Sequence, residues 1–131
     1  MQTNGTKKIL VVEDEEDVMT YLVTFFKANG FDVLTAKDGK EGFEIAKNQQ
    51  PDLISLDINM PEETGVRMYR NLHEDTATKG IPVVMITGVP SDFKRFIETR
   101  KQVEAPAGYF EKPIDRDAVL AKINEILNQQ A

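Results

Sequence analysis

The chain of 131 residues contains no cysteine. This absence excludes a disulfide framework, a thiolate nucleophile and a metal site built on cysteine. Long apolar runs are absent as well, since none approaches the roughly 18 residues that a membrane-spanning helix needs. The polar start, MQTNGTKK, lacks the apolar middle of a signal peptide. We therefore expect a cytoplasmic protein that makes no use of a membrane.

An excess of positive charge is also lacking. Lysine and arginine number 16 against 22 aspartate and glutamate residues, and the formal net charge is −6. Binding to a nucleic-acid backbone favours a basic face, so direct contact with nucleic acid is not expected. The length and the 40% apolar content suit one globular domain. We expect residues 1–6 to be a polar tail ahead of that domain.

Short apolar runs alternate with amphipathic stretches along the chain. The runs are rich in branched residues, which predicts buried strands at residues 9–12, 31–36, 53–57, 82–87 and 109–111. Helical spacing and capping residues predict helices at 15–29, 38–49 and 64–73, and helices that begin near Ser91 and Asp115. Strands joined by helical crossovers run parallel, with helices on both faces. The pattern predicts a doubly wound α/β domain.

Chemically able side chains follow four of the five predicted strands. They are Glu13 and Asp14 after the first, Asp57 at the end of the third, Thr87 at the end of the fourth and Lys112 after the fifth. Open parallel sheets bind ligands outside the carboxyl ends of their strands. We therefore expect these five side chains to meet at one site. This placement explains why the buried run before Asp57 ends in a charge.

Three carboxylates at one site repel one another, and a hard divalent cation relieves the repulsion. Mg²⁺ prefers oxygen ligands and commonly takes one or two carboxylates together with a phosphate. Asp14 and Asp57 are predicted as direct ligands, and Glu13 as a ligand directly or through water. The backbone carbonyl of Asn59 is a further candidate ligand.

A carboxylate beside Mg²⁺ can act as the nucleophile of aspartyl-phosphate chemistry. The oxygens of the phosphoryl group then need neutralisation. The metal covers one oxygen, Lys112 is a suitable point charge for a second, and Thr87 offers a hydroxyl for a third. The pattern therefore predicts Asp57 as a phosphoacceptor assisted by Lys112 and Thr87.

Four segments together resemble the receiver domain of two-component response regulators. The segments VVEDEE, LDINMPEETG, MITG and YFEKP have the order and spacing of that family, and the resemblance covers about residues 7–128. The chain is similar in size to the chemotaxis response regulator, a single-domain member. The resemblance implies a flavodoxin-like (βα)5 fold with strand order 2-1-3-4-5, a receiver domain at 7–129 and no output domain.

The resemblance also implies a function and its partners. Asp57 would accept a phosphoryl group, in the presence of Mg²⁺, from a sensor histidine kinase or a histidine phosphotransfer protein. Glu13 and Asp14 would form the acidic metal-binding pair, Lys112 would bind the phosphate, and Thr87 would be the switch hydroxyl. The protein would catalyse only its own phosphorylation and dephosphorylation.

Phosphorylation of such a domain acts on a protein target. By resemblance, Tyr109 takes the aromatic switch position, and the surface of the fourth helix, fifth strand and fifth helix changes to bind a downstream protein. The chain would work as a monomer or as a phosphorylation-dependent dimer. The bond between Lys112 and Pro113 matches one that the family usually holds cis.

Two features depart from the family pattern. Glu13 stands where many members have aspartate, which allows a water-mediated metal contact. The segment between Thr87 and Lys112 is a few residues longer than usual, around residues 100–106. The extra length leaves the shape of the fourth helix open and suggests an unusual partner.

Three other classes of protein share part of this pattern. A phosphohydrolase of the haloacid-dehalogenase type needs a second aspartate two residues after the nucleophile, where this chain has Asn59. A flavodoxin-like electron carrier needs a Ser/Thr/Gly phosphate loop after the first strand, where this chain has EDEED. A degenerate receiver that binds partners without phosphorylation is disfavoured because no key residue is missing.

Overall fold

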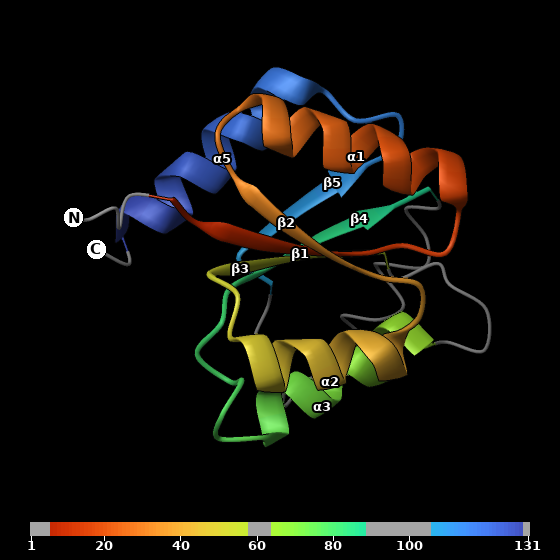
Figure 1. Ribbon diagram of the computed structural model, residues 1–131, viewed down its shortest axis with the longest axis vertical. Helices are drawn as coiled ribbons and strands as arrows, with labels where there is room; N and C mark the ends of the chain where they lie inside the picture. Colours follow the sequence, from red (N-terminus) through yellow and green to blue (C-terminus); the bar gives the residue numbers. More distant parts are fainter. Residues whose placement is uncertain (1–5, 58–63, 89–105, 130–131) are drawn as a thin grey trace.

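The computed structural model describes residues 6–57, 64–88 and 106–129. A five-stranded parallel sheet lies between two layers of helices (Figure 1). Its strands are β1 (Lys8–Val12), β2 (Asp32–Ala36), β3 (Leu53–Asp57), β4 (Val83–Thr87) and β5 (Gly108–Glu111). The strand order is β2-β1-β3-β4-β5, which confirms the predicted flavodoxin-like topology.

Helices cover both faces of the sheet. They are α1 (Glu16–Ala28), α2 (Gly39–Gln49), α3 (Thr64–Glu74) and α5 (Arg116–Gln129). The helices α1 and α5 lie on one face, and α2 and α3 lie on the other (Figure 1). The helix expected near Ser91 and the longer segment at 100–106 lie outside the described residues. No helix among the described residues is both long and apolar enough to cross a membrane.

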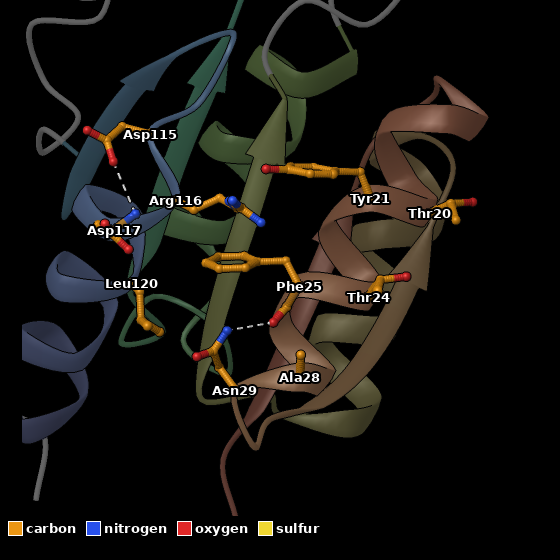
Figure 2. A pocket seen from close by; sticks show the side chains of 10 residues that line it. All are labelled: Thr20, Tyr21, Thr24, Phe25, Ala28, Asn29, Asp115, Arg116, Asp117 and Leu120. Atoms are coloured by element: carbon orange, nitrogen blue, oxygen red, sulfur yellow. Dashed lines mark hydrogen bonds between the residues drawn. The ribbon is translucent and has the colours of Figure 1, made fainter.

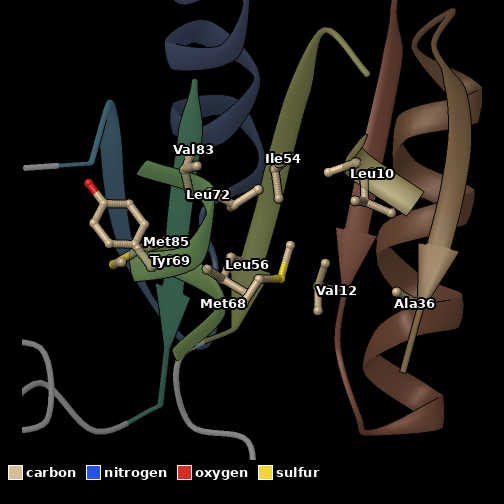
Figure 3. Packing of buried hydrophobic residues seen from close by; sticks show 11 residues of the cluster. Leu10, Val12, Ala36, Ile54, Leu56, Met68, Tyr69, Leu72, Val83 and Met85 are labelled. Carbon is tan, nitrogen blue, oxygen red and sulfur yellow. The ribbon is translucent and has the colours of Figure 1, made fainter. Parts of the chain in front are cut away.

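The central strands bury both of their faces, which explains their continuous apolar runs. On the side of α2 and α3, the core consists of strand residues such as Leu10, Ile54 and Leu56 packed against Met68 and Leu72 (Figure 3). On the side of α1 and α5, alternate strand residues such as Ile9 and Val11 pack against helix residues that include Leu22, Phe26 and Ile123. Burial of each large side chain contributes roughly 1.5–3 kcal/mol to folding.

Close packing between layers depends on one glycine of α2. A Cβ atom at Gly42 would lie 2.8 Å from Sδ of Met68 and 3.0 Å from Cγ2 of Val12. The first distance is shorter than a real Cβ atom tolerates and the second is tighter than most contacts, so a side chain at this position would force Met68 and Val12 to shift.

Two helix starts follow the capping rules. The Asp38 carboxylate accepts a hydrogen bond from the Glu41 N–H at 2.8 Å, and the Asp115 carboxylate accepts one from the Ala118 N–H at 3.2 Å. Such caps satisfy N–H groups that have no partner inside the helix. The helix α1 differs, because its N-cap residue, Glu15, makes no side-chain cap hydrogen bond.

The register of the sheet brings the strand ends level with one another. Val12 pairs with both Ala36 and Leu56, and Thr87 pairs with Glu111. The residues that follow β1, end β3 and follow β5 therefore lie along the same edge of the sheet.

Candidate functional site

Two buried carboxylates lie at the carboxyl edge of the sheet. Glu13 directly follows β1, and its N–H donates to the Ala36 carbonyl at 3.1 Å, which extends the pairing with β2 by one residue. Asp57 is the last residue of β3. Glu13 is 2% exposed and Asp57 is 3% exposed, so the sheet holds both charges in an interior position.

Asp14 completes an acidic cluster with these two residues. Glu13, Asp14 and Asp57 each offer a carboxylate oxygen, and the three oxygens lie within 4.8 Å of one another. Asp14 is exposed, so the cluster opens to solvent on its side. The three carboxylates that the sequence predicted to meet are therefore brought together.

Lys112 reaches into the cluster from the segment after β5. Its ammonium Nζ lies 3.3 Å from Oε1 of Glu13 and 3.4 Å from Oδ2 of Asp57. Its side chain is 20% exposed. The peptide bond between Lys112 and Pro113 is cis, as the sequence comparison with receivers implied.

A third carboxylate, that of Glu15, contacts the same ammonium. Oε1 of Glu15 lies 3.5 Å from Nζ of Lys112, and the Glu15 N–H donates to Oε2 of Glu13 at 3.2 Å. The sequence pattern predicted only that a helix begins at residue 15, and it did not predict this contact. The available signal was that glutamate is a poor N-cap residue.

The electrostatics of the cluster oppose the charge on Glu13. Burial raises the pKa of Glu13 to about 7, and repulsion from Asp57 adds to the effect. The ammonium of Lys112 and the N–H of Glu15 act in the opposite sense without cancelling it. For Lys112, burial works toward a lower pKa, but Asp57 and Glu13 outweigh it and raise the pKa. The site therefore has an excess of negative charge that favours a cation.

Two other predicted site residues, Thr87 and Asn59, are not placed at the cluster by the described part of the structure. Thr87 ends β4, one residue after the partner of Asp57 in the sheet, but its side chain lies outside the described part of the structure. Asn59 also lies outside the described residues.

Tyr109 lies in β5, packs against the core beside α2 and α3, and donates its hydroxyl to Glu111 at 3.2 Å. Burial, followed by the charge of Glu111, raises the pKa of Tyr109.

A cleft of about 750 Å³ lies elsewhere, between α1 and α5. In Figure 2 the rings of Tyr21 and Phe25 extend from α1 toward Arg116. Leu120 of α5 is only partly buried and lines this cleft. The lining contains no residue of the acidic cluster, so the cleft is separate from the site at the strand ends.

Comparisons with known proteins agree on one family. Residues 9–124 match the response regulator receiver domain. Protein PilH of Pseudomonas aeruginosa is 31% identical over 120 residues, which cover 92% of this chain and 97% of PilH. The alkaline phosphatase synthesis transcriptional regulatory protein PhoP of Bacillus subtilis is 32% identical over 94% of this chain, which spans 49% of that relative.

Solved structures show the same fold. A CheY-like response regulator receiver domain protein from Methanospirillum hungatei has a TM-score of 0.82 and 25% identity, and the match covers 96% of this chain and 97% of that one. The chemotaxis protein CheY4 of Vibrio cholerae has a TM-score of 0.78 and 24% identity, over 93% and 99% of the two chains. Because the family match extends over most of the chain and includes the strand-end cluster, this protein belongs to the response regulator receiver domain family.

Proposed function

We propose that Asp57 accepts a phosphoryl group in the presence of Mg²⁺ and that this modification switches the protein between two binding states. The observation that carries the proposal is the meeting of Asp57 with Glu13, Asp14 and Lys112 at one edge of the sheet. Residues 7–129 act as the receiver unit in this proposal.

The donor set of the acidic cluster fits Mg²⁺. Its three carboxylates are hard oxygen ligands close enough to share one ion, and Asp14 leaves the site open to water and phosphate. Asp14 and Asp57 would hold the ion, with Glu13 binding directly or through water and the Asn59 carbonyl as a further ligand. When bound, Mg²⁺ supplies positive charge beside the acceptor.

The phosphoryl transfer is an in-line displacement at phosphorus. A carboxylate oxygen of Asp57 forms a bond to phosphorus, and the bond from phosphorus to the donor's imidazole nitrogen breaks. The electron pair leaves with that nitrogen. A small acyl phosphate reacts in the same way, with a carboxylate as the leaving group. The ammonium of Lys112, already 3.4 Å from Asp57, then neutralises a phosphoryl oxygen.

The conformational change follows from the new charge. The Thr87 hydroxyl donates to another phosphoryl oxygen, and Tyr109 reorients in response. The surface that includes β5 and α5, together with the segment before β5, then changes its affinity for a downstream protein. One modification suffices if the two states differ by only a few kcal/mol.

Resetting requires hydrolysis of the acyl phosphate. Water attacks phosphorus, inorganic phosphate leaves, and the Asp57 carboxylate is regenerated. The phosphodonor in this proposal is a sensor histidine kinase or a histidine phosphotransfer protein. The chain catalyses only its own phosphorylation and dephosphorylation.

Intact-mass analysis tests the chemistry. The native chain and Asp57→Asn are incubated with acetyl phosphate and Mg²⁺, and the mass of each is recorded. We expect one phosphoryl addition on the native chain and none on the variant. Equal uptake by both chains would contradict the assignment of Asp57, and no uptake by the native chain would contradict phosphorylation itself.

A further inference from the structure

The Lys112 ammonium is shared among three carboxylates of very different exposure. Its Nζ lies 3.3 Å from Glu13, 3.4 Å from Asp57 and 3.5 Å from Glu15. The side chains of Glu13 and Asp57 are 1% and 2% exposed, whereas that of Glu15 is 64% exposed. Of these three partners, Glu15 is the exposed one, so its charge attracts the ammonium toward solvent.

The local conformation of Glu15 gives a second, independent observation. Glu15 takes the extended backbone of an N-cap residue, with φ −85° and ψ 121°, but its carboxylate caps nothing. The corresponding residues Asp38 and Asp115 do cap their helices. Both the carboxylate and the N–H of Glu15 contact members of the cluster instead. A residue that breaks a local rule in this way is a candidate for a role at the site.

The consequence concerns competition for Glu13 and Asp57. The ammonium of Lys112 neutralises the same two carboxylates that a divalent cation would bind. A carboxylate that draws the ammonium outward reduces this competition. The same carboxylate repels the phosphoryl anion that forms on Asp57, and it competes with that anion for Lys112.

We infer that Glu15 is a positioning residue that holds the Lys112 ammonium toward the solvent side of the site, which favours Mg²⁺ binding and limits the phosphorylated state. The inference rests on the proposed function and adds a regulation of the same site. Because the ion pair is exposed, the expected effects are modest, about two- to five-fold in affinity.

The test measures two ligands of opposite charge by isothermal titration calorimetry. The first is Mg²⁺ alone, and the second is beryllium fluoride at saturating Mg²⁺, as a mimic of the phosphoryl group. The variant is Glu15→Gln. The matched control is Glu16→Gln, which removes the same charge from an exposed neighbour for which the described structure contains no ion pair with Lys112.

We expect Glu15→Gln to weaken Mg²⁺ binding about two- to five-fold more than Glu16→Gln does and to strengthen beryllium fluoride binding by a similar factor. The opposite signs are a readout that simple loss of structure would not produce. In a Lys112→Gln background, Glu15→Gln should act no more strongly than Glu16→Gln, because the positioned ammonium is gone.

Three results would overturn the inference alone while the native chain still binds both ligands. They are equal effects of the two glutamine variants, weaker binding of both ligands by Glu15→Gln, and an undiminished Glu15 effect in the Lys112→Gln background. A native chain that binds neither Mg²⁺ nor beryllium fluoride would overturn the proposed function and this inference together.

Discussion

Two carboxylates of this protein pair with lysine in opposite electrostatic settings. Asp75, just after α3, accepts the Ala77 N–H at 2.8 Å and lies 3.3 Å from the Lys47 ammonium. These contacts, the backbone hydrogen bond first, lower the pKa of Asp75. Glu13 also contacts a lysine, yet burial and the nearby Asp57 raise its pKa to about 7.

The difference separates a structural charge from a functional one. The surroundings of Asp75 favour the anion, and its ion pair links the segment after α3 to Lys47 of α2. The surroundings of Glu13 disfavour the anion although a lysine is in contact. Strongly perturbed groups beside a charged cluster are typical of functional sites. At the carboxyl edge of the sheet, the described residues therefore neutralise the negative charge only in part, which favours binding of an added cation.

Loss of the metal, or of a residue that holds it, should have the largest effect on phosphoryl uptake. Removal of divalent cations with EDTA should abolish phosphoryl uptake from acetyl phosphate. Asp14→Asn should lower the Mg²⁺ affinity by more than the roughly 10- to 100-fold that loss of an outer-shell partner costs. Calorimetry and intact-mass analysis measure the two quantities. Asp75→Asn removes the same type of charge and should change neither, and a matching loss in that control would contradict the comparison.

Replacement of Lys112 should change Mg²⁺ binding and phosphoryl uptake in opposite directions. Lys112→Gln removes the cation that competes for Glu13 and Asp57, so Mg²⁺ should bind several-fold more tightly. The same change removes the ammonium that neutralises the phosphoryl group, so the rate of uptake from acetyl phosphate should fall. Lys47→Gln, at the structural ion pair, should alter neither value. Weaker Mg²⁺ binding by Lys112→Gln would show that the ammonium does not compete with the metal.

The stability of the metal-free protein should depend on pH through Glu13. Its folded pKa, about 7, lies above the ordinary value of 4.5, so this group stabilises the fold most at low pH and loses that contribution as pH rises through 7. From pH 6 to pH 8 the loss is about 1.3 kcal/mol, because only the part of this range below pH 7 contributes, and it lowers the unfolding temperature by several degrees.

Thermal unfolding in EDTA at a series of pH values measures this dependence. Glu13→Gln should flatten the curve, and Mg²⁺ should restore stability to the native chain at pH 8. If the native chain and Glu13→Gln lost stability in parallel across this range, Glu13 would not be the source of the pH dependence.

The smallest effect is expected at Asp75, with the opposite pH dependence. Its folded pKa lies below the ordinary value of 3.8, so its contribution is present above that value and is lost as pH falls through the folded pKa. Asp75→Asn should lower the unfolding temperature only slightly at pH 7, and the difference should vanish in strong acid. If Asp75→Asn changed the unfolding temperature at pH 8 by more than Glu13→Gln does, the contrast between the two carboxylates would be contradicted.

Most of the fold follows from local patterns in the sequence. The short runs at residues 9–12 and 53–57, rich in apolar residues, predict buried strands, and Asp38 and Asp115 mark helix starts; the structure confirms both. The rule that ligands bind at the carboxyl ends of parallel strands then brings Glu13 and Asp57 together before any coordinates exist.

Other features depend on geometry that local patterns do not contain. The acidic run after Asp14 reads as an ordinary helix start, and only the position of Lys112 shows that Glu15 belongs to the site. The raised pKa of Glu13 depends on burial depth and on its distance from Asp57. A lone Gly42 in a helix likewise does not reveal how closely Met68 approaches.

The most direct test of the account is to locate the phosphoryl group itself. The native chain is treated with acetyl phosphate in Mg²⁺ or in EDTA, the acyl phosphate is trapped by reduction with borohydride, and the modified peptide is identified by tandem mass spectrometry. We predict a single modified residue, Asp57, and only in the sample with Mg²⁺. Modification of a different residue, or equal modification of Asp57 in EDTA, would contradict a metal-dependent acceptor at this edge of the sheet.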